Sequence, residues 1–309
     1  MLRIETIDDG IPLFKALSSE VRVKIISLLI KHRELNMNEL SERLGIPGST
    51  LTAQIKLLDE CGILEIRGAG GSRGMQKLCS LKESRLLIEM FESPTRHKRL
   101  HNEVPVGSYS EFTVAAPCGL ASPSALIGKE DNPRYFDAPE RTGAGLIWFS
   151  AGFIEYPIPN YLPEGGKLVE LQISLELASH LPHASLEDKS LGVLFSINQI
   201  AVGSWIIPLD NDSYRSLHSP AWWKNARIQS GKIKLLTINQ KGAFIDGNNR
   251  ISDVTIDQLD ITPEKRIRLR ISSPGSGVTL FGRGFGNYTQ DISVTNIYSE
   301  KDEPGHRPF

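Results

Sequence analysis

Small hydroxyl side chains and one lysine recur along residues 49–61, in the segment STLTAQIKLLDEC. At about 100° per residue, three apolar side chains share one side of a helix and would face a core: Leu51, Ile55 and Leu58. Ser49, Thr52 and Lys56 then project to the opposite side, where such groups can enter a major groove and bond to base edges. The spacing therefore predicts a helix able to contact DNA.

A second group of basic side chains follows this segment. ILEIR and MQKLCSL alternate apolar and polar residues on either side of the glycine-rich GAGGSRG, which predicts a β-hairpin. Arg73 would lie at its tip, with Arg67 and Lys77 on the flanking strands. Contacts from these side chains and Lys56 to DNA phosphates would make binding strongly salt-dependent.

Tryptophan and polar side chains gather in predicted loops of the last two-thirds of the chain. An aromatic ring can stack on the apolar face of a sugar while Asp, Asn and Arg side chains bond to its hydroxyls. By analogy of fold and composition, we expect a site for a small polar ligand there, with a carbohydrate as the favoured class. The candidate residues are Trp205, Asp210, Trp222, Trp223, Asp246, Arg283 and Asn287.

An enzyme is an alternative for this region, because glycosidases use two carboxylates about 5–10 Å apart. Glu170 and Glu176 fail that test, since six residues of one strand would separate them by roughly 20 Å. A pair between strands, such as Glu176 with Asp246, stays open. We expect no enzymatic activity, no cofactor and no metal; His180 and His183 are interpreted as loop residues.

A second alternative is that the region serves only oligomerisation or protein partnering. The row Arg266, Arg268, Arg270 fits that role, although such rows are more often the solvated face of an edge strand.

The elements that would position the DNA-contacting residues are short helices. SSEVRVKIISLLIKH has Val23, Ile26 and Ile30 at helical spacing, and these are expected to face the core. In NMNELSERLG, Asn36 can cap a helix that Gly45 ends. A further amphipathic helix is expected in LKESRLLIEMF, after the hairpin. Helix, short turn, helix and basic hairpin are the order of a winged helix-turn-helix.

These segments resemble the ArsR-type winged-helix transcriptional repressors of bacteria over roughly residues 12–91. The resemblance implies a homodimer formed by the first and last helices, and a recognition helix at 49–61. By position, the family's base-reading stretch matches Ser49, Thr50, Thr52 and Gln54. Metal-sensing members carry a Cys-x-Cys pair in the preceding helix. The corresponding NMNELSERLG has neither Cys nor His, so no thiolate metal site is expected.

The remaining two hundred residues alternate with a period of two, as in KLVELQISLELAS and KRIRLRIS, and predict an all-β sandwich or jelly roll. In the first of these segments Val169, Leu171, Ile173, Leu175 and Leu177 would point inward. We therefore expect a DNA-binding domain at 1–91, a linker at 92–108 and a β-sandwich effector domain at 109–309.

Composition agrees with this division. The 309 residues carry a formal net charge of −1, which hides +3 over residues 1–100 and −4 over the remainder. Two of the 22 aromatic residues lie in the first hundred. With no long apolar segment and no leader-like start, we expect a cytoplasmic protein. The sequence thus predicts a dimeric DNA-binding repressor whose β-sandwich senses a small molecule.

Overall fold

The computed structural model describes residues 2–4, 6–71, 74–82, 86–88, 97–178, 192–206, 216–224, 231–247, 249–288 and 290–299. The chain divides into two compact units, Met1–Pro94 and Thr95–Phe309, called here the N-terminal unit and the β unit.

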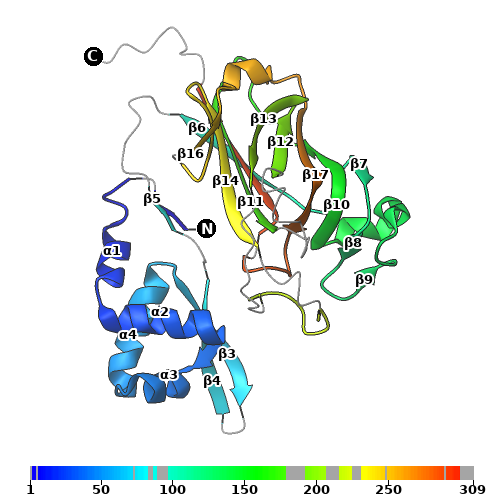
Figure 1. Ribbon diagram of the computed structural model, residues 1–309. Helices are drawn as coiled ribbons and strands as arrows, with labels where there is room; N and C mark the ends of the chain where they lie inside the picture. Colours follow the sequence, from blue (N-terminus) through cyan, green and yellow to red (C-terminus); the bar gives the residue numbers. More distant parts are fainter. Residues whose placement is uncertain are drawn as a thin grey trace, which may run out of the picture. The chain divides into compact units, whose positions relative to one another are not determined.

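The N-terminal unit combines four helices with short strands (Figure 1). In chain order its elements are β1 (Leu2–Ile4), α1 (Ile11–Leu17), α2 (Glu20–His32), β2 (Glu34–Asn36), α3 (Met37–Leu44), α4 (Gly48–Glu60), β3 (Leu64–Gly71), β4 (Gly74–Leu81) and β5 (Leu86–Ile88). Strands β3 and β4 form the predicted hairpin, and β2 adds to β4 to complete a small antiparallel sheet. This order confirms the winged helix-turn-helix prediction.

Local sequence explains the ends of α3 and α4. The Asn36 side chain accepts a hydrogen bond from the Glu39 amide (2.9 Å), and the Glu39 carboxylate accepts one from the Asn36 amide (2.8 Å). This capping box satisfies two amides at the start of α3, and Gly45 ends the helix at φ +64°. Pro47 then precedes α4, so Ser49 lies inside that helix. The predicted core face of α4, Leu51, Ile55 and Leu58, is fully buried.

The predicted core face of α2 is wrong. Ile25 and Leu29 are buried, whereas Val23 and Ile30 are 45% and 52% exposed. At about 100° per residue, the centre of the observed pair lies roughly 110° around the helix axis from the centre of the predicted three. Of the predicted residues, Ile26 is partly buried and packs against the core. Several apolar side chains surround this helix, and the spacing could not decide which of them would meet α1, α3 and α4.

The predicted closing helix is also corrected. Leu86–Ile88 form strand β5, which pairs in parallel with β1. Strand β1 comes from the other end of the unit, and a run of three apolar residues does not distinguish a strand from a helix. Residues 83–85 and 89–91 of the predicted helix lie outside the described residues.

The β unit is an antiparallel sheet domain, as predicted (Figure 1). Its strands are β6 (Lys98–Val104), β7 (Glu111–Val114), β8 (Cys118–Ala121), β9 (Leu126–Ile127), β10 (Leu146–Ile158), β11 (Lys167–Ala178), β12 (Val193–Ile197), β13 (Ile200–Trp205), β14 (Lys232–Asn239), β15 (Gly242–Ile245), β16 (Asn249–Ser252), β17 (Ile267–Phe281) and β18 (Ile292–Ser299). Short 3-10 turns lie at Pro133–Asp137, Pro139–Gly143 and Ile256–Leu259.

Three long strands divide this sheet into two branches. β17 pairs with β10 along nearly its whole length; near its start its other neighbour is β12, and near its end it is β11. One branch therefore runs β13-β12-β17-β10-β7 and the other β16-β15-β14-β11-β18-β6. Buried side chains from both branches form one hydrophobic cluster, so the branches pack face to face as two layers.

The alternation in β11 is confirmed for Leu171, Ile173, Leu175 and Leu177, all buried in this core. At the start of the strand Leu168 is buried in place of Val169, because the register shifts between residues 168 and 170.

The segment expected to be a linker, 92–108, also differs from expectation. Its residues Lys98–Val104 form β6, paired with β18, because KRLHNEV itself alternates.

Candidate functional site

Helix α4 presents a polar face to solvent. Ser49, Thr50, Thr52 and Lys56 are exposed on it, opposite the buried Leu51 and Ile55. The Thr52 hydroxyl donates to the Gly48 carbonyl (2.8 Å), which leaves its oxygen able to accept. Lys56 lies 3.6 Å from Glu60 with 74% of its side chain exposed, so a phosphate can replace that weak contact. The face offers small hydrogen-bonding groups and one mobile cation.

Gln54 occupies a different position from the other four. Its carbonyl oxygen accepts a hydrogen bond of 2.6 Å from the Arg22 guanidinium. Arg22 also donates to the carbonyls of Ala16 (2.5 Å) and Lys15 (2.7 Å). Because these groups come from α1, α2 and α4, the guanidinium fixes α4 on the helices behind it, and Gln54 serves as the contact on α4.

The hairpin carries its basic residues on two different faces. In the register of β3 and β4, Lys77 is opposite Gly68 and Arg67 is opposite Leu78. Cross-strand partners share a face and successive residues alternate, so Arg67 and Lys77 point to opposite sides of the hairpin. Arg67 is held 2.9 Å from Glu65, while Lys77 is exposed. Arg73 lies outside the described residues.

Comparison with known proteins agrees with this geometry. Residues 19–65, which span α2 to the start of β3, match the family model of the winged helix-turn-helix DNA-binding domains. The N-terminal unit is a winged helix-turn-helix DNA-binding domain. The chain is therefore a DNA-binding transcriptional regulator, and the resemblance seen in the sequence is confirmed for this domain.

Two solved structures are each similar to about a quarter of the chain. HlyU from Vibrio cholerae shares 25% identity, with 24% of this chain and 76% of that one covered and a TM-score of 0.21. A transcriptional regulator homologue from Pyrococcus horikoshii shares 16% identity, with 23% and 74% covered and a TM-score of 0.19. No curated protein matches the chain.

The cysteines of the winged-helix domain are placed as small apolar residues. Cys79 is fully buried, and desolvation raises the pKa of its thiol to about 11. Cys61 is half-buried, and burial raises its thiol pKa as well. Both thiols are therefore neutral near pH 7, the form that does not bind metal. The described residues contain no cluster of His, Cys, Asp and Glu suited to a metal ion.

In the β unit, the predicted tryptophan cluster is divided. Trp222 and Trp223 pack with Trp148 and Phe285 at ring-centroid distances of 5.5–6.4 Å, in a second apolar cluster of the unit. Trp223 is buried, and the Trp222 indole N–H donates to the Pro123 carbonyl (2.8 Å). These rings are engaged mainly with each other.

Trp205 belongs to a different group, at the edge of the main core. The Lys234 ammonium lies 4.4 Å from the centre of its ring and 2.6 Å from Asp246. The structure therefore brings Trp205 and Asp246 together, with a lysine over the ring where a sugar would have to stack.

The remaining predicted residues serve other contacts. Arg283 pairs with Glu103 and lies 3.5 Å from Asp291, and the Asn287 side chain accepts from the Leu217 amide (3.2 Å). Asp210 lies outside the described residues. Among the described side chains, the predicted set is thus divided over several polar and apolar clusters.

Glu176 is a functional candidate that sequence reasoning left unresolved. It is 1% exposed and accepts hydrogen bonds of 2.8–3.2 Å from the amides of Gly231, Asn287 and Tyr288. Desolvation raises the pKa of its carboxyl to about 8, against the lowering effect of those amides. Asp246, its suggested partner, is bound to Lys234 instead. The sequence signal that points to a buried carboxyl here is its position between Leu175 and Leu177, two leucines that the alternation of the strand predicts to be buried.

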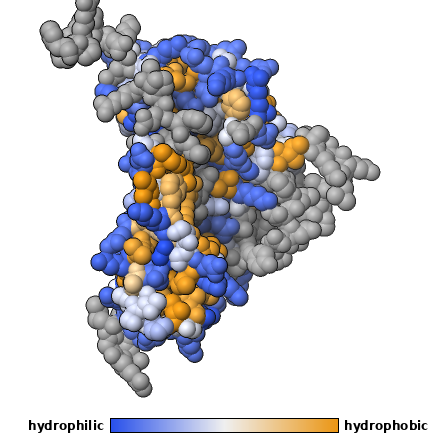
Figure 2. Space-filling view, turned by 90° about the vertical axis from the view of Figure 1, so that its left-hand side faces the viewer, coloured by the Kyte–Doolittle hydropathy of each residue, from blue (hydrophilic) through white to orange (hydrophobic). Residues whose placement is uncertain are grey.

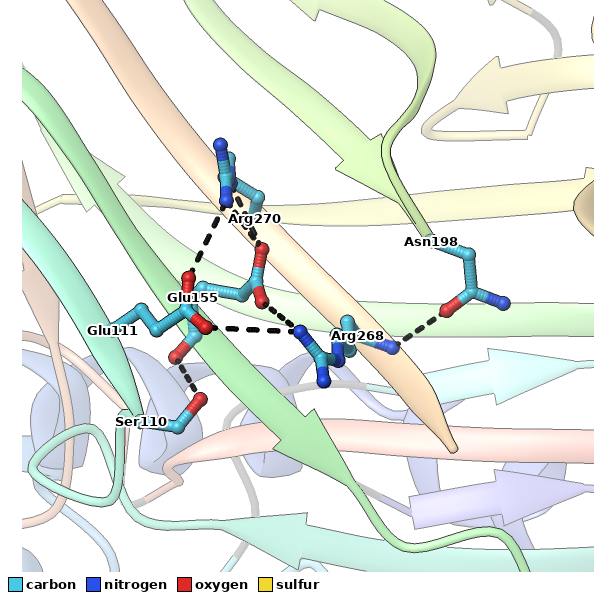
Figure 3. Close-up of polar contacts among 6 residues, drawn as sticks. All are labelled: Ser110, Glu111, Glu155, Asn198, Arg268 and Arg270. Carbon is cyan, nitrogen blue, oxygen red and sulfur yellow. Dashed lines mark hydrogen bonds and ion pairs between the residues drawn. The ribbon is translucent and has the colours of Figure 1, made fainter. Parts of the chain in front are cut away.

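A charged network covers the outer face of the branch β13-β12-β17-β10-β7 (Figure 3). Glu155 of β10 is 2% exposed and lies 2.8 Å from Arg270 and 3.4 Å from Arg268, both on β17. Glu111 of β7 lies 3.7 Å from each arginine. The interpretation of these arginines as an edge-strand face is wrong, because β17 lies between β10 and β12.

In the described part of the chain, no helix is long and apolar enough to cross a membrane.

Proposed function

We propose that this chain is a homodimeric repressor that reads a two-fold symmetric operator with α4. The exposed polar face of α4, in a domain matched to DNA-binding winged helices, is the observation that carries the proposal. Ser49, Thr50 and Thr52 would contact base edges, while Lys56, Arg67, Arg73 and Lys77 would contact phosphates. Gln54 would act mainly by holding α4 in place. Such a protein works where the chromosome is, in the cytoplasm.

The test begins with operator fragments selected from genomic DNA by the full-length protein. Replacing Thr52 and Lys56 together by Glu should weaken operator binding by at least about a hundredfold, or roughly 3 kcal/mol. A matched control replaces Thr142 and Lys129 by Glu in the β unit, where Thr142 also donates to a backbone carbonyl (3.1 Å). The control changes net charge equally and should bind normally. Unchanged affinity in the α4 variant would reject the assignment of the recognition helix.

Exposed apolar side chains support the dimer. Among the described residues, the N-terminal unit exposes seven large apolar side chains: Ile7, Ile11, Val23, Ile30, Leu57, Leu86 and Ile88. The larger β unit exposes three, and Figure 2 shows apolar patches on the molecular surface. A domain that exposes this many apolar side chains is expected to bury some of them against a partner. Sedimentation should give a dimer, and charge substitution at Val23 with Ile30 should give a monomer with weaker operator binding.

For the β unit we propose a regulatory role, as the domain that binds a small polar effector. A ligand that binds one arrangement of the dimer better than another would change operator affinity by that difference. A carbohydrate is the first class to test. Full-length protein bound to its operator would be titrated with sugars, and a changed operator affinity is expected. If no sugar has an effect, partnering or assembly would become the favoured role of this unit.

A further inference from the structure

A pocket of about 390 Å³ opens where β10 ends and β17 begins. Pro157, Pro159 and Pro263 form much of its wall, and the turn Glu264–Arg266 supplies charged groups. Its volume falls within the range of small-molecule sites. None of the ligand residues predicted from the sequence lines it.

The pocket is held in shape before any ligand arrives. The Asn160 side-chain amide donates to the carbonyls of Thr262 (2.8 Å) and Lys265 (2.7 Å), which ties the segment after β10 to the turn before β17. The three prolines have fixed φ angles and add stiffness. A preformed wall lowers the entropy lost on binding and so favours affinity for a small molecule.

The charge beside this pocket is not balanced. Arg268 and Arg270 are neutralised by Glu155 and Glu111 (Figure 3). Arg266 extends the same outward-facing row, since the alternate residues Ile267, Leu269 and Ile271 are buried. Among the residues that the structure describes, no carboxylate pairs with Arg266.

The neighbouring charges of the turn have different surroundings. Lys265 pairs with Asp260, so its charge is compensated. Glu264 is exposed next to the pocket and would repel an anion.

We propose that this pocket binds the effector, and that the effector is a small molecule carrying a carboxylate or a phosphate. The Arg266 guanidinium would hold the anionic group with paired, charge-assisted hydrogen bonds, which are stronger than bonds between neutral groups. The proline walls would contact the rest of the ligand. This inference rests on the regulatory role proposed for the β unit and adds the place and the charge of the ligand.

The test is titration calorimetry of the full-length protein with four probes: D-glucuronate, glucose 6-phosphate, inorganic phosphate and D-glucose. We expect binding of at least one of the two acidic sugars, and the pair distinguishes a carboxylate from a phosphate. D-glucose has the same ring without the charge and should bind at least tenfold more weakly. Inorganic phosphate measures how much the anion contributes without the sugar.

Three variants assign the binding to the pocket. Arg266→Gln should weaken the acidic probe at least tenfold. Lys167→Gln removes the same charge from a lysine that pairs with Asp257 and does not line the pocket, and it should change binding less than about threefold. Glu264→Gln should strengthen binding, because it removes a repelling charge. Thermal melting of each variant confirms that the unit is folded.

The proposal is overturned if no anionic probe binds with a Kd below about 10 mM, which corresponds to a binding free energy of about −2.7 kcal/mol. It is also overturned if Arg266→Gln binds like the wild type, or if D-glucose binds as tightly as D-glucuronate. Operator binding, measured separately, distinguishes the two proposals. A neutral sugar that shifts operator affinity in the wild type and in Arg266→Gln alike would leave the regulatory role standing and refute this pocket.

Discussion

The buried Glu176 predicts that the β unit loses stability as the pH rises. Its carboxyl pKa is raised from 4.5 to about 8 in the folded state, so between these values the folded unit binds more protons than the unfolded one. Unfolding is then favoured by raising the pH, with a limiting slope of about 1.4 kcal/mol per pH unit for one proton. From pH 5 to pH 7 the stability should fall by on the order of 2 to 3 kcal/mol.

The perturbation that isolates this effect is Glu176→Gln, which keeps the shape and removes the titration. The variant should show little of the pH dependence seen in the wild type, so the stability difference between them should change by about 2 to 3 kcal/mol over that range. Glu140→Gln, at an exposed position of the same unit, is the control and should preserve the wild-type profile.

Urea unfolding followed by tryptophan fluorescence is a suitable assay. All four tryptophans, at 148, 205, 222 and 223, lie in the β unit, so the signal reports the unfolding of that unit alone. A stability difference that stays constant from pH 5 to pH 8 would refute the reasoning. It would mean that the amides of Gly231, Asn287 and Tyr288 keep the carboxylate ionised despite its burial.

Three further predictions concern contacts that hold the two units in shape. Arg22→Met removes the bond to Gln54 and two carbonyl contacts, and should cost about 2 kcal/mol in unfolding of the N-terminal unit, measured by circular dichroism, with weaker operator binding. Gly286→Ala places a methyl against the buried Glu176 carboxylate at a position where φ is +72°, and should lower the melting temperature of the β unit by several degrees. Arg270→Met leaves buried Glu155 with one arginine and should cost about 2 kcal/mol, which a further Glu155→Met substitution should partly restore.

Local signals predicted the winged helix well because its chemistry is short-range. The Asn36 cap, the Gly45 end and the alternation on either side of the hairpin glycines each depend on residues within a few positions. The errors have longer-range causes. The orientation of α2 depends on which of several apolar faces packs better, and β5 depends on pairing with β1, more than eighty residues earlier.

The predicted ligand site was divided for a related reason. An exposed tryptophan ring can stack on a sugar, yet burial of large aromatic area is among the strongest contributions to folding. Trp148, Trp222 and Trp223 therefore pack together with Phe285. Trp205 is covered by Lys234, which Asp246 holds in place. Composition located aromatic residues that stabilise the unit, and the same property makes them poor indicators of a free binding surface.

Charge left uncompensated by the fold is a better guide to a ligand in this unit. Arg266, Arg268 and Arg270 are equivalent in the sequence, and only the pairing of β17 with β10 and of β10 with β7 shows that two of them meet Glu155 and Glu111. The pocket beside the third depends on Asn160 reaching a turn about a hundred residues later. No local pattern contains either fact. Among the described residues, Arg266 combines a guanidinium that no carboxylate pairs with and a position in the wall of a preformed pocket, so a search for the effector should begin there.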